Sequence, residues 1–261
     1  MSDKEPHIRM WPDWADEFLQ GELGTFLDFG CGPGVFVQRV RPRCRRAVGV
    51  DMDGERLAEA RAAVPEASFI QLVPNTPVPL EDESFDTISF QEVIEHVPDE
   101  RFVLLELTRL LKPGGRLLLT TPHRGLLTFL DPGNVKFVAP PVHRFIHRFL
   151  LRNKDYYEER FGADRRRDGM IADFALQERP WHRHYRLGQI RTYAPRALAV
   201  EQWAVYFPFM RAFWSARLVL KVLSRGRYTE LPAALRRKQA ELSRRRGCAG
   251  DQLVVLFRKV S

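Results

Sequence analysis

Short apolar runs alternate with helix-like segments through the first half of the chain, and this alternation restricts the fold more than any other feature. The runs cover residues 25–30, 46–51, 67–72, 85–90 and 116–122. Each is nearly continuous in apolar side chains, as expected of strands that are buried on both faces. Asp53 and Asp99 are suited to cap helices that follow them, and Pro65 ends the first of these helices. The pattern predicts an α/β fold in which crossover helices connect the strands of a parallel sheet.

The alternation fails after residue 122. Residues 123–186 are rich in Arg, His and aromatic side chains and form too long a stretch for a simple loop, so we predict an inserted lid or substrate subdomain. Strand-like runs return at 197–207 and 252–260. The segment 207–250 between them is a mixed basic and apolar insertion. We therefore expect one domain, residues 1–261, that carries two insertions.

Charge is distributed unevenly over the chain. The net charge is +8, but residues 1–121 have a balance of −8 and residues 122–261 a balance of +16. A strongly basic half attracts phosphates, anionic lipid or nucleic acid, although a solvated basic surface explains the composition equally well. The 3 cysteines show neither a disulfide framework nor metal-ligand spacing, so we predict no metal site. The first 25 residues lack a continuous apolar segment, and we expect a cytoplasmic protein, with peripheral membrane attachment left open.

A glycine-rich turn follows the first predicted strand, in "FLDFGCGPGVFVQRV". The spacing of Gly30, Gly32 and Gly34 satisfies neither the dinucleotide nor the phosphate-loop motif. An acid, Asp28, precedes the turn, and a second, Asp51, ends the next strand. A carboxylate at that position can accept hydrogen bonds from both hydroxyl groups of a ribose. The sequence therefore predicts a nucleoside pocket that does not require phosphate.

Four ordered motifs, "LDFGCGPG", "VGVDMD", "SFDTISFQEVIEHV" and "LLKPGGRLLLTTP", resemble those of the class I S-adenosylmethionine-dependent methyltransferases, in particular their small-molecule branch. The resemblance implies a Rossmann-like, seven-stranded, mostly parallel sheet of order 3-2-1-4-5-7-6. It also implies an antiparallel last strand, helices on both faces and a lid-like insertion after strand 5. The implied cofactor is S-adenosyl-L-methionine.

The resemblance also implies which residues bind this cofactor. Asp28, Gly30 and Gly32 would hold its amino acid part, Asp51 would bind the ribose hydroxyls, and Gln91 would border the methionine moiety.

The adenine end departs from the family pattern. Met52 would lie against the adenine, but Pro74 stands near the place where a typical member has an acid that accepts the adenine amino group. We expect the side-chain oxygen of Asn75 to substitute for it.

A hydroxyl acceptor needs a general base, and histidine is the first candidate. His123 directly follows the fifth predicted strand, although a structural role or a substrate hydrogen bond would also fit it. His182 and His184 lie where the insertion returns to the core, and a closing lid could bring one of them inward. His96 is interpreted as local structure or pocket wall.

The sequence gives weaker indications of which class of molecule accepts the methyl group. The residues "SFQE" replace the D/N-P-P-Y/F motif of amino-directed nucleobase methyltransferases, so nucleic acid is not favoured. Residues 207–223 fit either a buried helix or an interfacial helix at an anionic membrane surface.

Trp181, Tyr185 and Trp203 beside arginines would suit stacking on sugars or lipid-linked acceptors. We therefore expect O-methylation of a hydroxyl on a glycan, glycolipid or related metabolite. Two alternatives stay open: C- or N-methylation of a quinone-like or other small metabolite, and a non-catalytic cofactor-binding protein that uses its basic half for membrane or partner contact. The sequence does not predict the oligomeric state.

Overall fold

The computed structural model describes residues 12–73, 76–125, 128, 140–145, 148–149, 183–224, 227–228, 230–243, 245–247 and 250–260. The helices and strands are, in chain order, α1 (Pro12–Phe18), β1 (Gly24–Phe29), α2 (Val35–Val40), the short 3-10 helix η1 (Arg41–Arg43), β2 (Cys44–Asp51), α3 (Gly54–Ala63), β3 (Ser68–Gln71), β4 (Phe85–Gln91), α4 (Glu100–Leu110), β5 (Leu111–Pro122), α6 (Pro140–Phe145), α9 (Leu187–Tyr193), β6 (Leu198–Pro208), α10 (Met210–Leu223), α11 (Ala233–Ser243) and β7 (Gly250–Lys259).

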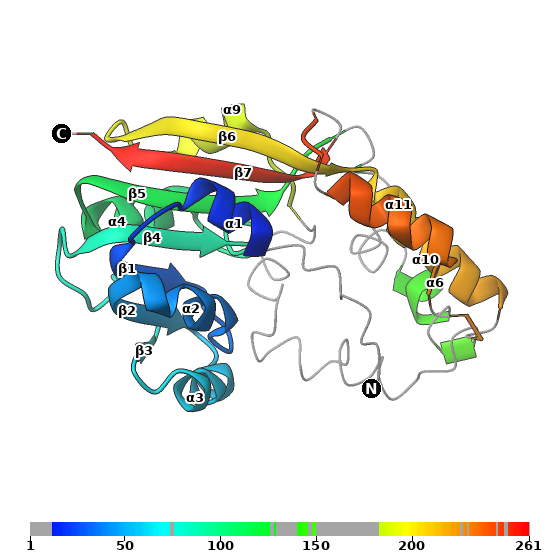
Figure 1. Ribbon diagram of the computed structural model, residues 1–261, viewed down its shortest axis with the longest axis horizontal. Coiled ribbons are helices and arrows are strands. Elements are labelled where there is room, and N and C mark those ends of the chain that lie inside the picture. Colours follow the sequence, from blue (N-terminus) through cyan, green and yellow to red (C-terminus); the bar gives the residue numbers. More distant parts are fainter. Residues whose placement is uncertain are drawn as a thin grey trace.

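The strands form one seven-stranded sheet of order β3-β2-β1-β4-β5-β7-β6 (Figure 1). The strands from β1 to β5 pair in parallel, and β7 runs antiparallel to both β5 and β6. The predicted α/β Rossmann-like fold and its antiparallel last strand are thus confirmed. The parallel strands end at Phe29, Asp51, Gln71, Gln91 and Pro122, and β7 begins beside them at Gly250. We call this the carboxyl edge, because ligands of open α/β sheets bind at this side.

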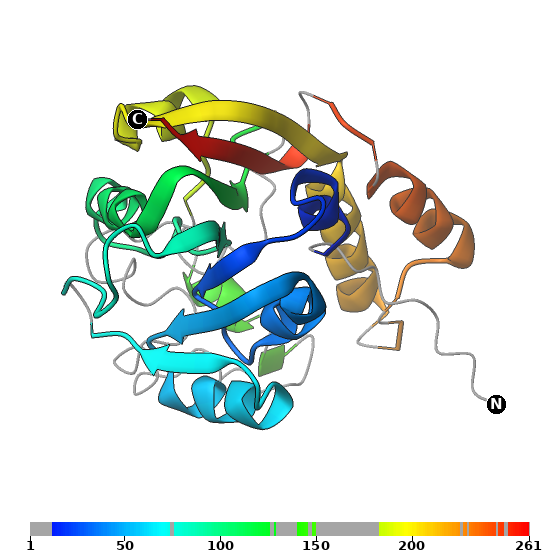
Figure 2. The ribbon, with the colours of Figure 1, turned by 60° about the vertical axis from the view of Figure 1, so that its left-hand side comes forward.

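Helices cover both faces of the sheet (Figure 2). On one face Leu107 of α4 and Ile190 of α9 are fully buried in a single apolar cluster with side chains of the strands. On the other face Phe18 of α1, Val37 of α2 and Leu57 of α3 belong to a second cluster. Each such side chain stabilises the fold by about 1.5–3 kcal/mol. The two apolar layers together hold the strand ends at the carboxyl edge in place.

Two aspartates begin helices as predicted. Asp53 Oδ1 accepts the N–H groups two and three residues further on, at 3.0 and 3.1 Å, and Asp99 Oδ1 does the same at 2.9 and 3.0 Å. These bonds satisfy N–H groups that have no partner inside the helix. After α4 the chain enters β5 directly at Leu111, earlier than the predicted start at residue 116.

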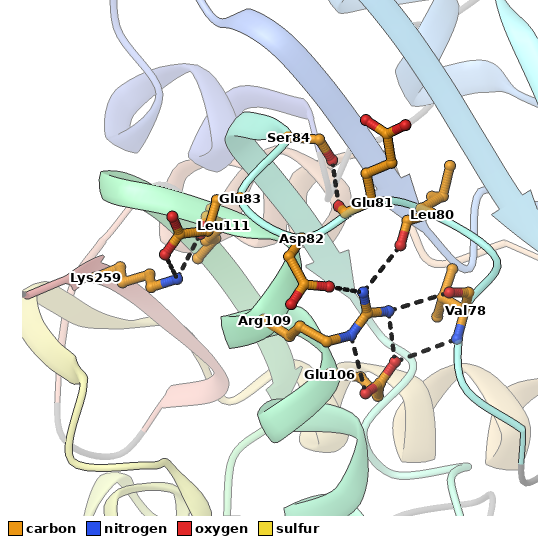
Figure 3. Close-up of polar contacts among 10 residues, drawn as sticks. All are labelled: Val78, Leu80, Glu81, Asp82, Glu83, Ser84, Glu106, Arg109, Leu111 and Lys259. Atoms are coloured by element: carbon orange, nitrogen blue, oxygen red, sulfur yellow. Dashed lines mark hydrogen bonds and ion pairs between the residues drawn. The ribbon is translucent and has the colours of Figure 1, made fainter.

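Arg109 of α4 fixes the connection between β3 and β4 (Figure 3). Its guanidinium donates to the carbonyl oxygens of Val78 and Leu80 at 3.1 and 2.9 Å and to Glu106 Oε2 at 2.9 Å. Glu106 Oε2 in turn accepts the N–H of Val78 at 3.2 Å. The hydrogen bond with Glu106 raises the pKa of Arg109 further above its ordinary value. Through Arg109, α4 thus holds the segment between β3 and β4, which begins near the predicted adenine end of the site.

The helices α10 and α11 lie beyond the carboxyl edge (Figure 1). Large apolar side chains stay exposed on them: Val219 is 54%, Leu223 78% and Leu235 44% exposed. The alternative of a fully buried helix at 207–223 is therefore wrong. In the part of the chain that the structure describes, no helix is both long and apolar enough to cross a membrane.

Candidate active site at the carboxyl edge

The glycine turn lies over the end of β2. The N–H groups of Gly30 and Cys31 both donate to the carbonyl oxygen of Val50, at 2.8 and 3.0 Å, and the N–H of Gly32 donates to Asp51 Oδ2 at 2.8 Å. Hydrogen bonds thus join the turn to the acid that ends the next strand. Because a carboxylate can accept about four hydrogen bonds, Asp51 keeps capacity for further donors.

Gly30 also brings the turn against the segment that follows β4. Its φ of 80° lies in the left-handed region, and a Cβ there would stand 2.3 Å from Cγ2 of Val93. Only glycine permits this approach. The residues after β4 therefore lie next to the glycine turn.

Asp28 is a buried carboxyl two residues before the turn, with 4% exposure. Burial raises its pKa to about 7; a hydrogen bond with Ser89 opposes this rise, and the charge of Asp51 adds to it. The side-chain amide of Gln91 donates to the same Ser89 hydroxyl at 2.8 Å. A nearby cation would restore the ionised form of Asp28, so this position suits an ammonium group.

The predicted adenine residues are only partly described. Met52 follows β2, is half-buried, and accepts a hydrogen bond at its carbonyl oxygen from Gln71 Nε2 at 3.0 Å. Asn75 lies outside the described residues. The roles assigned to Met52 and Asn75 therefore stay predictions.

His123 follows β5 and is fixed by β7. Its Nδ1 lies 2.8 Å from the carbonyl oxygen of Gly250. Because a carbonyl only accepts, this hydrogen bond assigns the hydrogen to Nδ1 and leaves Nε2 as an acceptor in the neutral ring. Burial lowers the pKa of His123 below its ordinary value; the Gly250 bond opposes the shift and the charge of Arg211 adds to it. The ring is thus neutral at neutral pH.

A buried ion pair supports the backbone of His123. Arg211, in the first turn of α10, and Asp251 in β7 are 3% and 2% exposed. Their side chains form an ion pair, and Asp251 Oδ2 also accepts the N–H of Arg211 at 2.9 Å. Arg211 Nη2 donates to the carbonyl oxygen of His123 at 2.9 Å, and the N–H of His123 donates to the carbonyl oxygen of Asp251 at 2.8 Å. This cluster joins α10, β5 and β7 at one point.

The other predicted histidines are less informative. His184 is half-buried in the segment that leads into α9, and His182 and Trp181 lie outside the described residues.

The predicted stacking role of Tyr185 is wrong, because this side chain is 3% exposed and its hydroxyl donates to a carboxylate of α4 at 3.0 Å. Trp203 lies on the outermost strand, β6, and is 50% exposed.

Sequence reasoning missed a pair of carboxyl groups after β4. Glu92 Oε1 accepts the Thr120 hydroxyl at 2.8 Å and the side-chain amide of Gln252. The Glu95 side chain is 1% exposed and accepts the Thr121 hydroxyl at 3.2 Å. Burial, and then the charge of Glu92, raise the pKa of Glu95 well above its ordinary value. The only signal in the sequence is the spacing of the two acids in "EVIEHV" directly after a buried strand.

The backbone at Glu92 is strained. Its φ is 53°, in the left-handed region that non-glycine residues rarely adopt. Such a conformation costs about 1–3 kcal/mol and persists where surrounding contacts enforce it. Here the N–H of Glu92 donates to the carbonyl oxygen of Thr120 at 3.0 Å.

Comparisons with known proteins agree with this geometry. A family model described as a methyltransferase domain matches residues 27–119. The ubiquinone biosynthesis O-methyltransferase of Aeromonas salmonicida is 30% identical over 45% of this chain and 52% of its own length. That of Stutzerimonas stutzeri is 27% identical over 67% of this chain and 77% of its own length. An S-adenosylmethionine-dependent methyltransferase from Mesorhizobium loti superposes with a TM-score of 0.58 at 17% identity, over 95% of this chain and 96% of that chain, which shows the shared fold.

The strand order, the glycine turn joined to an acid, and the matched domain define an enzyme that uses a nucleoside-type methyl donor. Residues 27–119 match the methyltransferase domain, and the chain has the fold of S-adenosylmethionine-dependent methyltransferases. Its cofactor is S-adenosylmethionine, which when bound supplies an electrophilic methyl group. The buried Asp28 fits the cofactor's ammonium group, and the residues that would hold the cofactor beside it are Gly30, Gly32 and Asp51.

Proposed function

We propose that the protein transfers the methyl group of S-adenosylmethionine to a hydroxyl oxygen of a small organic molecule. A hydroxyl loses its proton around the transition state, so it needs a group nearby that can take this proton. The observation that carries the proposal is His123 at the carboxyl edge, because its bond to Gly250 leaves Nε2 as a proton acceptor in a neutral ring. C- or N-methylation would not require such a group.

We propose a quinone-like or other small aromatic metabolite as the first acceptor class to test. Two of the relatives, those reported above, are named ubiquinone biosynthesis O-methyltransferase, which supports a hydroxyl on a small molecule. The glycan or glycolipid acceptor rested on stacking surfaces, and Tyr185 is unavailable for stacking because it is buried. Glycans and glycolipids therefore become the second class.

The test has two stages. Calorimetric titration with S-adenosylmethionine and S-adenosylhomocysteine establishes cofactor binding, and transfer of a labelled methyl group to panels of phenols, sugars and amines identifies the acceptor atom. We expect binding and transfer to a phenolic oxygen. Transfer to carbon or nitrogen would support the other enzymatic alternative. Binding without transfer to any acceptor would support a non-catalytic protein.

We further propose that α10 and α11 face an anionic membrane surface. Their exposed apolar side chains include Val219, Leu223 and Leu235, and the half of the chain that carries them has a charge balance of +16. Apolar side chains among cations suit a surface of anionic headgroups. In flotation assays Leu223→Asp should weaken association with anionic vesicles, whereas the control Val260→Asp, beyond the far end of β7, should not. Equal binding to neutral vesicles, or none to either, would contradict the proposal.

A further inference from the structure

A pocket of about 330 Å³ lies between the end of α9 and the start of β6. Both elements belong to the border of the sheet that β6 forms (Figure 1). Arg191 and Arg196 line the pocket together with apolar residues that include Leu198, Val200 and Phe257. Small-molecule sites typically occupy about 300–1,000 Å³ and combine an apolar lining with a few polar groups. The pocket therefore has the size and the mixed lining of a site for a small ligand.

This pocket is separate from the carboxyl edge. Phe257 of β7 pairs with Leu117 of β5, whereas Gln252 pairs with Pro122 at the carboxyl edge. The two positions are five residues apart along an extended strand, which at about 3.4 Å per residue makes roughly 17 Å. Leu198 begins β6 and lies at the same far end. A ligand in this pocket would not occupy the methyl-donor site.

The floor of the pocket is part of the apolar core. Phe257 is fully buried and Leu198 is 6% exposed, and both belong to the apolar cluster that α4 and α9 share with the sheet. Val200 packs against the same cluster. A hydrocarbon group that enters the pocket would meet these side chains and leave water, which favours binding by about fourfold for each methylene group buried.

The two arginines make the pocket basic. Arg191 and Arg196 are both exposed, and in the part of the chain that the structure describes neither forms an ion pair with a carboxylate. The first acid along β6, Glu201, is bound through both of its oxygens by Arg258, each at 2.9 Å. The C-terminal carbonyl groups of α9 add a partial negative charge of about half an elementary charge, which two guanidinium groups outweigh.

We propose that this pocket binds a small amphiphilic anion, namely a carboxylate or phosphate monoester with a short hydrocarbon tail. The anionic head would bind Arg191 and Arg196, because a guanidinium group matches the oxygens of a carboxylate or a phosphate. The tail would lie on Leu198, Val200 and Phe257. This second site is independent of the proposed O-methylation, since none of these residues lies at the carboxyl edge.

The first test is calorimetric titration of the whole chain with sodium octanoate and with octyl phosphate. At least one of them should bind at a single saturable site, and the tighter binder shows which head group fits. Octanol has the same tail without the charge and should bind at least about tenfold more weakly, because hydrogen bonds between charged groups contribute affinity. Hexanoate, with two methylene groups fewer, should bind roughly 15-fold more weakly than octanoate.

The second test uses variants of the two arginines. Arg191→Gln and Arg196→Gln should each weaken binding of the octyl anion by about tenfold or more, because each removes one cation from the pocket. Affinity for S-adenosylmethionine should stay unchanged, which also shows that the variants are folded. Arg46→Gln is the matched control: Arg46 lies on β2, is also exposed and has no ion pair among the described residues. This control should bind the octyl anion as the wild type does.

Several results would overturn the inference. They are the absence of saturable binding for both octyl anions, binding of octanol as tight as that of octanoate, and full binding in both arginine variants, which would mean that the anion binds elsewhere on the basic surface. Displacement of octanoate by S-adenosylhomocysteine would do so as well, because the anion would then occupy the methyl-donor site. Octanoate binding in a protein that methylates no hydroxyl would support this inference and contradict only the proposed function.

Discussion

Two parts of the carboxyl edge are built differently. One is the cofactor side, which consists of the glycine turn and Asp51; the other is the side of His123 and Glu92, which we call the acceptor side because the proposed hydroxyl acceptor would bind there. On the cofactor side the key hydrogen bond joins Gly32, in the turn after β1, to Asp51, which ends β2, and the two residues are 19 positions apart. On the acceptor side the partners of His123 and Glu92 are Gly250 and Gln252, 127 and 160 positions away. The first arrangement belongs to one contiguous strand–turn–helix–strand unit. The second exists only once the last strand has joined the sheet, so it depends on the whole fold.

The strongest test of this difference is the buried ion pair of the acceptor side. Arg211→Met leaves Asp251 buried without its cation, and breaking a buried pair in this way costs about 3–5 kcal/mol. Denaturant unfolding should show that loss. The exposed pair between Arg217 and Glu230, whose side chains are 49% and 51% exposed, is the control, and Glu230→Gln should cost at most about 1 kcal/mol.

Two further results bear on this prediction. The double variant Arg211→Met/Asp251→Leu should regain stability relative to the single variant, because it removes the orphaned charge. Equal, small losses in Arg211→Met and Glu230→Gln would mean that this cluster does not hold the acceptor side together.

The next largest effect concerns the cofactor side alone. Asp51→Ala removes a charged acceptor, and hydrogen bonds to charged groups are worth about 1.5–3 kcal/mol each, so affinity for S-adenosylmethionine should fall by at least about 100-fold in calorimetry. Asp53→Asn is the matched control, since it keeps a side-chain oxygen for the α3 cap. Similar losses of affinity in both variants would mean that the effect comes from a disturbed connection between β2 and α3 and not from lost ribose recognition.

Asp28 gives the cofactor side a pH dependence. Its pKa near 7 means that the native state binds a proton between about pH 4 and 7 that the unfolded state has released, so the free energy of unfolding of the cofactor-free protein falls as pH rises through this window. A cationic ligand favours the ionised carboxylate. Affinity for the cofactor should therefore increase by up to about tenfold per pH unit from pH 5.5 to 7. Calorimetry on Asp28→Asn should give a flat profile; a slope that survives in this variant would point to another group.

The smallest predicted effect is local. Asp99→Ala removes the cap of α4 and should cost about 1 kcal/mol in thermal or denaturant unfolding, and Asp99→Asn should cost less because it keeps the accepting oxygen. If the loss in Asp99→Ala matched that in Arg211→Met, the acceptor side would depend on local helix ends as much as on its distant contacts.

These differences explain what the sequence could and could not predict. Strand order and the caps at Asp53 and Asp99 follow from local patterns and from the family resemblance, and the structure bears them out. Tyr185 was misread because an aromatic side chain in a basic segment looks the same whether it stacks on a ligand or packs into the core. Composition alone does not show whether a side chain is buried.

The carboxyl pair was missed for a related reason. Glu92 and Glu95 acquire their setting from Thr120, Thr121 and Gln252, which two other strands supply. No window of sequence contains this set. The spacing of the two acids is visible in the sequence, but an amphipathic loop would show the same spacing.

The reversed direction of β7 has a consequence for how such an enzyme can diversify. The chain leaves the sheet at Pro208 and returns at Gly250, and both points lie at the carboxyl edge. The intervening excursion can therefore be lengthened, shortened or exchanged during evolution without rebuilding a strand, provided that a contact such as the one between Arg211 and Asp251 fixes its entry. The segment between β6 and β7 can change in this way while the glycine turn and Asp51 stay as they are.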